Sequence, residues 1–395
     1  MLAVLALALA VFLVLRAARK DDGVLARNRE FGARFLAHAD PYFDTTRGHR
    51  VHGPYPPSYV IATVPLALVS EGVARAGWAV LQVAALASLY VLTKSWLRRA
   101  WPDQALHAPM IFALALLLAS RFLLRDMAGG GGNLLYSGLA LWGVEFALRK
   151  RALLGGGLLA LSLVLKPNLA PFVLFLVCVR RWRALCACLA IAVGLVLAPA
   201  LHFGFDAWIE LIDRWLHDLF QFARAVNLAD AHEVPDGFPL ADTSMNQSVR
   251  EALWRALPAN VAAWSTRFVA LALLVTASWV AIRARSERAL SLAVALFLPV
   301  SVLISPVSWK AHHVVLIALF VVLIAEARDV RAKWPWILIV VYYVSCVLLS
   351  EEIVGKDLKN ALQALSIVTL GAVSLFVAGV ALAVRRTIAE EEALA

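Results

Sequence analysis

Apolar blocks of roughly 15–25 residues alternate along the chain with short polar or basic pieces. Blocks of this length fit a bilayer whose hydrocarbon core is about 30 Å thick, so the pattern predicts α-helices that span a membrane. We predict one all-α transmembrane domain over residues 1–395 with about twelve spans. The predicted spans cover residues 1–15, 58–70, 74–96, 105–125, 133–148, 152–179, 184–202, 260–282, 289–305, 311–327, 334–350 and 362–384.

Two long polar segments, about 16–57 and about 204–258, interrupt this pattern. In each, apolar side chains recur at helical spacing, as at Phe31 and Phe35 in the first segment and at Trp208 in the second. This spacing predicts in both segments an amphipathic helix that lies in the membrane interface.

Composition and charge narrow the class of protein. The chain is 62% apolar and 16% charged, whereas soluble proteins average about 45–50% and about 25%. A soluble enzyme, a disordered chain and a fibrous protein are therefore excluded. Most of the excess behind the net charge of +10 lies in short loops between apolar blocks, which is typical of cytoplasmic loops. Charge scattered in this way forms no basic face, so we expect no nucleic acid partner.

The basic loops also set the expected topology. Twelve spans place both termini on one side, and the flank Arg385-Arg386 assigns that side to the cytoplasm, so both long polar segments face outward. Arg98-Arg99 and Arg149–Arg151 would then lie outside, against the charge rule. A hairpin over 152–179 that turns at Lys166-Pro167 would bring both inside. The block 58–70 must then not span if the segment 16–57 is to stay outside. Twelve spans are the preferred prediction and this hairpin is the alternative.

Lys166 is the first candidate site residue, because an ionisable group inside an apolar block is costly. It lies in the middle of the run 152–179 and precedes Pro167, which breaks a helix. A lysine at a helix break makes a concave cationic spot, which suits the phosphate of a lipid head group. The structural alternative is a lysine that snorkels to the interface.

A second candidate group, Trp309, Lys310, His312 and His313, opens the predicted span at 311. Its position at an outward membrane face indicates the rim of a substrate site. Adjacent histidines point about 100° apart on a helix, so hydrogen bonds to a phosphate or sugar suit them better than a shared metal ion. An aromatic-belt anchor is the structural alternative.

Two further groups carry polar side chains of the right kind. The run Gly129–Gly132 before Asn133 lets a ligand or another backbone approach closely, although a flexible loop is the structural alternative. The side-chain amides of Asn246 and Gln247 are suited to hydrogen bonds with sugar hydroxyls.

Several short motifs, taken in their order along the chain, resemble glycosyltransferase family 87. They are Asp40-Pro41-Tyr42, Tyr55-Pro56-Pro57, Gly132-Asn133, Lys166-Pro167, Arg180-Arg181-Trp182-Arg183, Asn246-Gln247-Ser248, and Ser305-Pro306 through Trp309 to His312-His313. The resemblance extends from about residue 21 to 327.

The resemblance implies a membrane fold of the GT-C type and a polyprenyl-phosphate-sugar donor, used on the outer face of the bacterial cytoplasmic membrane. Such enzymes usually invert the configuration at the anomeric carbon and use a carboxylate of the first loop as general base. The resemblance therefore makes Asp22 and Glu30 the catalytic candidates. No metal and no cofactor is expected, because the lipid-phosphate sugar is itself a substrate.

We therefore predict a hexosyltransferase, with mannose as the first choice of sugar. Its expected partners are a lipid or glycan acceptor and the membrane lipids. The predicted substrate-binding residues are Tyr55, Asn133, Lys166, Asn246, Gln247, Trp309, Lys310, His312 and His313. Two alternatives stay open: a lipid-linked-sugar transporter or flippase, and a membrane acyltransferase with His312 or His313 as base.

Overall fold

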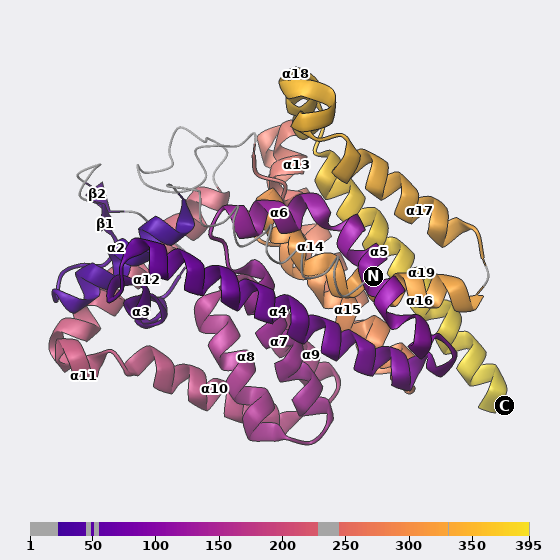
Figure 1. Cartoon of the computed structure of the whole chain (residues 1–395), viewed down its shortest axis with the longest axis horizontal. Helices are drawn as coiled ribbons and strands as arrows, with labels where there is room; N and C mark the ends of the chain where they lie inside the picture. The colour runs from indigo at the N-terminus through magenta and orange to yellow at the C-terminus, as the bar shows by residue number, and fades with distance from the viewer. Residues whose placement is uncertain (1–22, 45–48, 51–54, 228–244, 331, 395) are drawn as a thin grey trace.

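The computed structural model of the chain describes residues 23–44, 49–50, 55–227, 245–330 and 332–394 (Figure 1). The described part is all-helical apart from one small antiparallel hairpin, in which β1 (Phe43–Asp44) pairs with β2 (His49–Arg50). The all-α prediction is therefore confirmed. The predicted first span, residues 1–15, and the candidate base Asp22 lie outside the described residues.

The helices follow the apolar blocks closely. In the first half of the chain they are α2 (Val24–Leu36), η1 (Pro57–Thr63), α3 (Val64–Ala67), α4 (Glu71–Ala100), η2 (Pro102–His107), α5 (Ala108–Leu118), α6 (Ser120–Ala128), α7 (Asn133–Leu148), α8 (Ala152–Leu165), η3 (Pro167–Leu169), α9 (Pro171–Cys178) and α10 (Trp182–Leu197). In the second half they are α11 (Ala200–Phe203), α12 (Phe205–Asn227), α13 (Val249–Ala256), α14 (Ala259–Arg283), α15 (Glu287–Leu303), η6 (Lys310–Leu316), α16 (Ile317–Val330), α17 (Trp334–Tyr342), η7 (Tyr343–Leu348), α18 (Glu351–Ala364) and α19 (Ile367–Leu394).

The number of membrane spans is smaller than predicted. Among the described residues, four helices are long and apolar enough to cross a membrane, or up to six if each of two bent helix pairs forms one span. The predicted blocks 289–305 and 311–327 instead contribute helices of the interior. Side chains are buried without a break from Ser291 to Leu303 in α15 and from Ile317 to Ala327 in α16. A helix that is apolar all round packs in the centre of a bundle, so the count of twelve is not confirmed.

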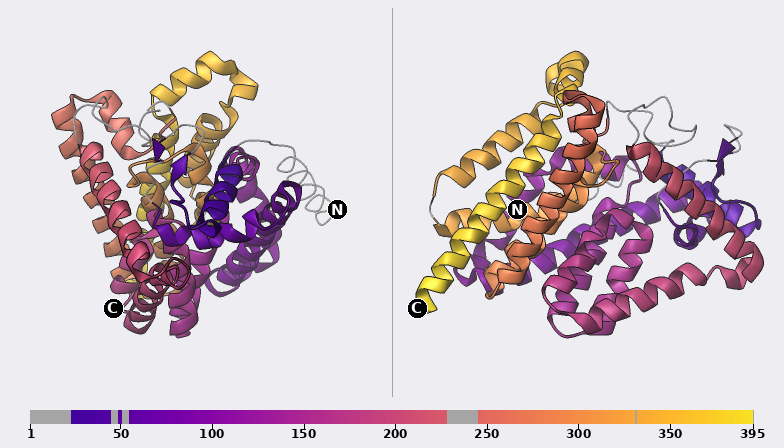
Figure 2. Two further views of the ribbon diagram at one scale, coloured as in Figure 1. Left: turned by 90° about the vertical axis from the view of Figure 1, so that its left-hand side faces the viewer. Right: turned by 180° about the vertical axis from the view of Figure 1, so that it is seen from behind.

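Basic loops that are far apart in the sequence meet at one end of the bundle. The ion pairs there are Arg99–Glu287 (3.0 Å), Arg149–Glu287 (3.1 Å), Arg288–Asp329 (2.5 Å) and Arg386–Asp329 (3.3 Å). We call this end, where the chain terminates, the basic end. The strands, α13 and α18 lie at the opposite end, which we call the site end (Figure 1, Figure 2).

The run 152–179 forms two short helices that turn at Lys166-Pro167. Pro167 has no N–H to continue the α8 ladder, and the chain restarts as η3 and α9. Gly156, near the start of α8, packs against Ala184 and Cys188, near the start of α10. Because α9 ends four residues before α10 begins, it leads back to the end where α8 starts. The structure thus has the hairpin alternative rather than a single span.

The segment 58–70 agrees with this hairpin. It forms only the short pieces η1 and α3, which together cover Pro57–Ala67 and fall well below the length of a span. Arg99 and Arg149 both pair with Glu287, which neighbours Arg288, and Arg288 shares Asp329 with Arg386. These residues therefore lie at the same end as the C-terminal flank. The preferred prediction of a single span over 152–179 is not confirmed, because Lys166-Pro167 ends α8 and turns the chain back, as the hairpin alternative required.

Gly156 makes a close contact between this hairpin and α10, and replacing it tests the packing. A Cβ atom at Gly156 would lie 2.6 Å from the Ala184 carbonyl oxygen and 2.7 Å from the Cys188 nitrogen. We expect Gly156→Ala to lower stability by about 1–3 kcal/mol through overpacking, measured as a lower melting temperature of the detergent-purified chain. Gly157→Ala is the matched control, because its Cβ would meet only Ile191 Cδ1 at an ordinary 3.4 Å. Equal melting temperatures for the two variants would contradict the contact.

Candidate functional site

Lys166 lies at the centre of a polar cluster at the site end. Its ammonium donates a hydrogen bond to the Tyr55 hydroxyl at 3.0 Å and lies 3.2 Å from His312 Nε2. Because an ammonium has no lone pair, His312 accepts through Nε2 and its ring is neutral, with the proton on Nδ1. Lys166 is only 8% exposed. The three predicted site residues come from segments 111 and 146 positions apart, and the fold brings them together.

The first polar segment holds Tyr55 in place. The Tyr42 hydroxyl donates to the Tyr55 carbonyl oxygen at 2.8 Å, and the Tyr55 ring stacks on Tyr59 with centroids 4.8 Å apart. Tyr59 in turn donates to Asn28 Oδ1 at 3.1 Å. Asn28 lies on the buried face of α2, so the predicted amphipathic helix is present and supports the site.

Asn133, another predicted residue, is fixed by a carboxylate that sequence reasoning missed. Its amide nitrogen donates to Asp126 Oδ1 at 2.6 Å, and the backbone N–H of Leu134 donates to Asp126 Oδ2 at 3.2 Å. Asp126 is fully buried and interacts electrostatically with Lys166. It thus caps the N-terminus of α7, whose first N–H groups have no partner within the helix. The feature of the sequence that could have pointed to Asp126 is its position, seven residues before Asn133 and shortly before the glycine run.

The run Gly129–Gly132 allows other groups of the protein to approach its backbone closely. The Gly129 carbonyl accepts the N–H of Val24 at 3.2 Å, where α2 begins, and the Gly131 carbonyl accepts the indole N–H of Trp78 at 3.2 Å. A Cβ atom at Gly131 would overlap the carboxylate of Asp126. The glycines therefore join α2, α4 and α6 in one tightly packed turn.

Asn246 and Gln247 join the second polar segment to the loop before η6. The Asn246 amide donates to the Pro306 carbonyl at 2.9 Å and accepts the N–H of Ser308 at 2.9 Å. Gln247 is fully buried and donates to the Gln363 carbonyl at 3.2 Å. The Asn246 amide holds the loop that leads to His312, whereas the Gln247 amide bonds to α18, and contact of either amide with a sugar stays a prediction.

The remaining predicted residues lie around His312. Trp309 is partly exposed, with its ring stacked against His312, and Lys310 donates to the side chain of Gln363. His313 points elsewhere: it is fully buried beside Phe122, and neither ring nitrogen has a partner among the described residues. The two adjacent histidines therefore face different surroundings, as helical geometry predicts.

The catalytic base is not defined by these contacts. Glu30 is half-buried on α2, and the polar partners of the Lys166 ammonium are Tyr55 and His312 rather than Glu30. Asp22 lies outside the described residues. No group of three His, Cys, Asp or Glu side chains that could hold a metal ion gathers in the part of the chain that the structure describes.

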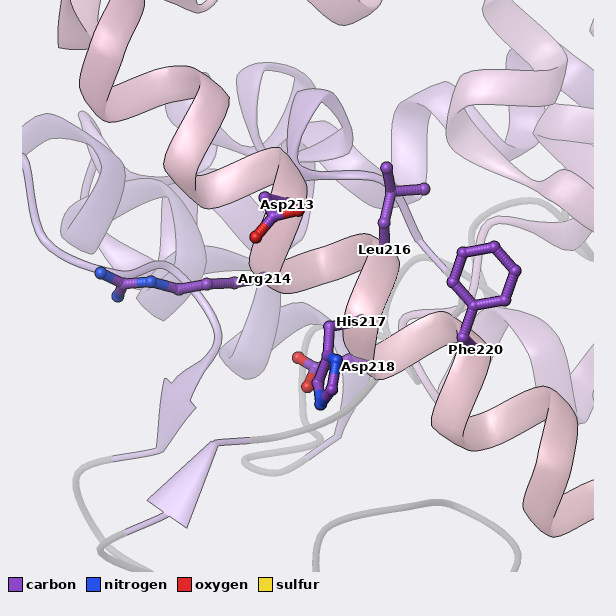
Figure 3. Close-up of a pocket in the computed structure, with 6 residues that line it drawn as sticks. All are labelled: Asp213, Arg214, Leu216, His217, Asp218 and Phe220. Carbon is purple, nitrogen blue, oxygen red and sulfur yellow. The ribbon is translucent and has the colours of Figure 1, made fainter.

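The second polar segment contains the predicted amphipathic helix as α12, which buries Trp208, Leu211 and Phe222. On its other side lies an open depression of about 390 Å³, and Figure 3 draws the side chains of this one helix that line it. Its lining residues are Asp213, Arg214, Leu216, His217, Asp218 and Phe220. Because one exposed helix face supplies them all, we do not assign the depression to the site around Lys166.

Comparison with known proteins places the chain in a family. The sequence model of glycosyltransferase family 87 matches residues 54–306, which include Tyr55, Asn133 and Lys166 but end before His312. Glu30 precedes the match. No protein of curated function matches the chain. The family match covers well over half of the 395 residues. The matched range contains apolar helices and the buried Lys166. The chain therefore belongs to glycosyltransferase family 87 and is a membrane glycosyltransferase.

Proposed function

We propose that the chain transfers a hexose, with mannose as the first choice, from a polyprenyl-phosphate donor to a lipid or glycan acceptor. One observation carries this proposal. Lys166 is buried and forms no direct ion pair with any described residue, because Asp126, which interacts with it electrostatically, is held by Asn133 and Leu134 instead. A buried charge is costly unless an opposite charge pairs with it, and the donor's phosphate would supply that direct partner.

The proposed reaction is an inverting displacement. The acceptor hydroxyl oxygen attacks the anomeric carbon, the bond from that carbon to the phosphate oxygen breaks, and polyprenyl phosphate leaves with the bonding electrons. Lys166 would neutralise the negative charge that develops on the leaving oxygen, with Tyr55 and His312 holding its ammonium in place. The hydroxyl proton would pass to a first-loop carboxylate, for which Asp22 and Glu30 are our candidates.

The proposed orientation follows from charge. Arg99, Arg149 and Arg386 gather at the basic end, and the positive-inside rule assigns such an end to the cytoplasm. Lys166 and Asn133 would then face outward, across the bacterial cytoplasmic membrane. Donor and acceptor would reach the site from the outer leaflet without crossing the bilayer.

A transfer assay tests the proposal. The full chain would be reconstituted in liposomes with radiolabelled polyprenyl-phosphate-mannose, -glucose or -pentose and a total extract of bacterial membrane lipids as acceptor. We expect label to appear in a new lipid or glycan product, with mannose preferred. Folded protein that transfers none of the three sugars would overturn the proposal.

Variants of the candidate bases separate a transferase from a flippase. Asp22→Asn and Glu30→Gln leave volume unchanged but remove the general base, so one of them should abolish transfer. Translocation without bond formation, measured as protection of the donor from an external reagent, would tolerate both changes. Translocation that persists with no product would favour the flippase instead.

A further inference from the structure

Four cationic side chains gather beside η6 at the site end, apart from Lys166. Arg121 and Arg125 lie one turn apart on α6, which packs against η6, and Lys310 opens η6 itself. Arg121 donates to the Cys346 carbonyl at 2.7 Å, which holds its guanidinium near the turn before α18. Lys359 lies on α18, paired with Glu351 at 3.0 Å. We call these four residues the outer cationic cluster.

The members of the cluster act on one another electrostatically. Burial, and after it the charges of Arg121, Lys359 and Arg125, together lower the pKa of Lys310 to about 7, while Glu351 opposes them. Three cations and one carboxylate around a half-buried ammonium leave an excess of positive charge. Arg125 is exposed and has no polar partner for its side chain among the described residues, so its guanidinium is free for a ligand.

The surroundings of the cluster favour a lipid over a solute. α18 and the residue after it expose the apolar side chains of Ile353, Leu358 and Leu365, by 64%, 50% and 68%. Lys359 and these apolar side chains lie on or beside the two pieces of α18, which kinks at Gly355. Basic and exposed apolar side chains side by side are typical of a surface that contacts anionic lipid head groups and the adjoining acyl chains. α6 and α18 both lie at the site end (Figure 1).

We propose that Arg121, Arg125, Lys310 and Lys359 bind the phosphate of an anionic membrane lipid. The guanidinium groups of Arg121 and Arg125 are suited to paired hydrogen bonds with phosphate oxygens, and the two lysines add point charges. This site is separate from the Lys166 cluster, and its occupation requires no sugar transfer.

Protonation of Lys310 gives the site a pH dependence. Since the pKa of Lys310 is about 7, its positive charge is present below pH 7 and lost above it. Phosphatidylglycerol keeps its single negative charge throughout this range, so its affinity should fall between pH 6 and pH 8.5 with a midpoint near neutrality. Lys310→Gln should flatten this profile, because the titrating charge is then absent at every pH. A wild-type profile that is already flat would remove Lys310 from the site.

Lipid titration of the detergent-purified full chain tests the site directly. Short-chain phosphatidylglycerol, short-chain phosphatidylcholine and inorganic phosphate would be titrated separately, with bound lipid counted by native mass spectrometry. We expect phosphatidylglycerol to bind more tightly than either of the others. Each surface charge contributes about 1 kcal/mol, or about fivefold, so Arg125→Gln/Lys359→Gln should weaken phosphatidylglycerol about 25-fold.

Arg98→Gln/Arg183→Gln is the matched control, because it removes two exposed positive charges of the predicted basic side, at the end of α4 and the start of α10. It should leave tight phosphatidylglycerol binding unchanged. Equal affinity for phosphatidylcholine, or equal losses in both double variants, would overturn the proposal. Inorganic phosphate that binds as tightly as phosphatidylglycerol would overturn the lipid as the source of the anion. Since no donor is present, failure of the proposed transferase activity would leave this result unaffected.

Discussion

Replacement of Lys166 by alanine should lower kcat/KM for sugar transfer by about 10²–10³-fold, the usual effect of removing one preorganised group that stabilises transition-state charge. The ammonium is buried against Tyr55 and His312, where a charge–charge interaction is screened less than in water. Among the residues that the structure describes, no other cation contacts these two side chains. The developing charge on the leaving phosphate would therefore lose its principal partner.

Two further variants separate the effect of the size of Lys166 on activity from the effect of its charge. Lys166→Met keeps most of the volume and should lose as much activity as alanine, whereas Lys166→Arg keeps the charge and should retain part of it. Lys150→Ala, an exposed lysine in the Arg149–Arg151 loop, is the control and should be unaffected. Rates from the reconstituted transfer assay, with melting temperatures to confirm folding, give the comparison. A methionine variant within threefold of wild type would contradict a role for the charge.

The sequence allowed the helices and the central lysine to be predicted for one physical reason. An apolar composition makes every buried polar group costly, so the few that occur mark places where the fold compensates for them. Lys166 and His312 were found in this way, Tyr55 came from the resemblance to the family, and the structure joins the three. The length of an apolar block likewise predicts a helix well.

The membrane topology and the hydrogen-bond partners of the polar side chains could not be predicted in the same way. The blocks that became α15 and α16 are as apolar as lipid-facing helices, because a protein interior and a lipid chain select the same residues. Nor does the sequence show that Asn246 would hold Ser308, since the two lie 62 positions apart. Asp126 was missed because its importance comes from its hydrogen bond to Asn133, and the glycine turn lies between the two residues in the sequence.

Asp126→Ala should be the most destabilising single change at the site, by about 2–4 kcal/mol. The substitution leaves the Asn133 amide and the Leu134 N–H without an acceptor where water is excluded, and each such group costs about 1–3 kcal/mol. Loss of the α7 cap is part of the same cost. Asp126→Asn keeps one carbonyl acceptor and should be milder. Melting temperatures of the purified variants measure both, and equal values for alanine and asparagine would contradict the capping role.

A double-mutant cycle with Gly131 tests the geometry of this turn more sharply. Gly131→Ala alone should destabilise the chain, because its Cβ would overlap the Asp126 carboxylate. In the Asp126→Ala background that carboxylate is gone and the methyl group gains space, so the second change should cost little. The two effects should then be less than additive by about 1 kcal/mol or more, as for residues in direct contact. Strict additivity would mean that Asp126 does not occupy the space beside Gly131, and the link from Asp126 to Asn133 would fail with it.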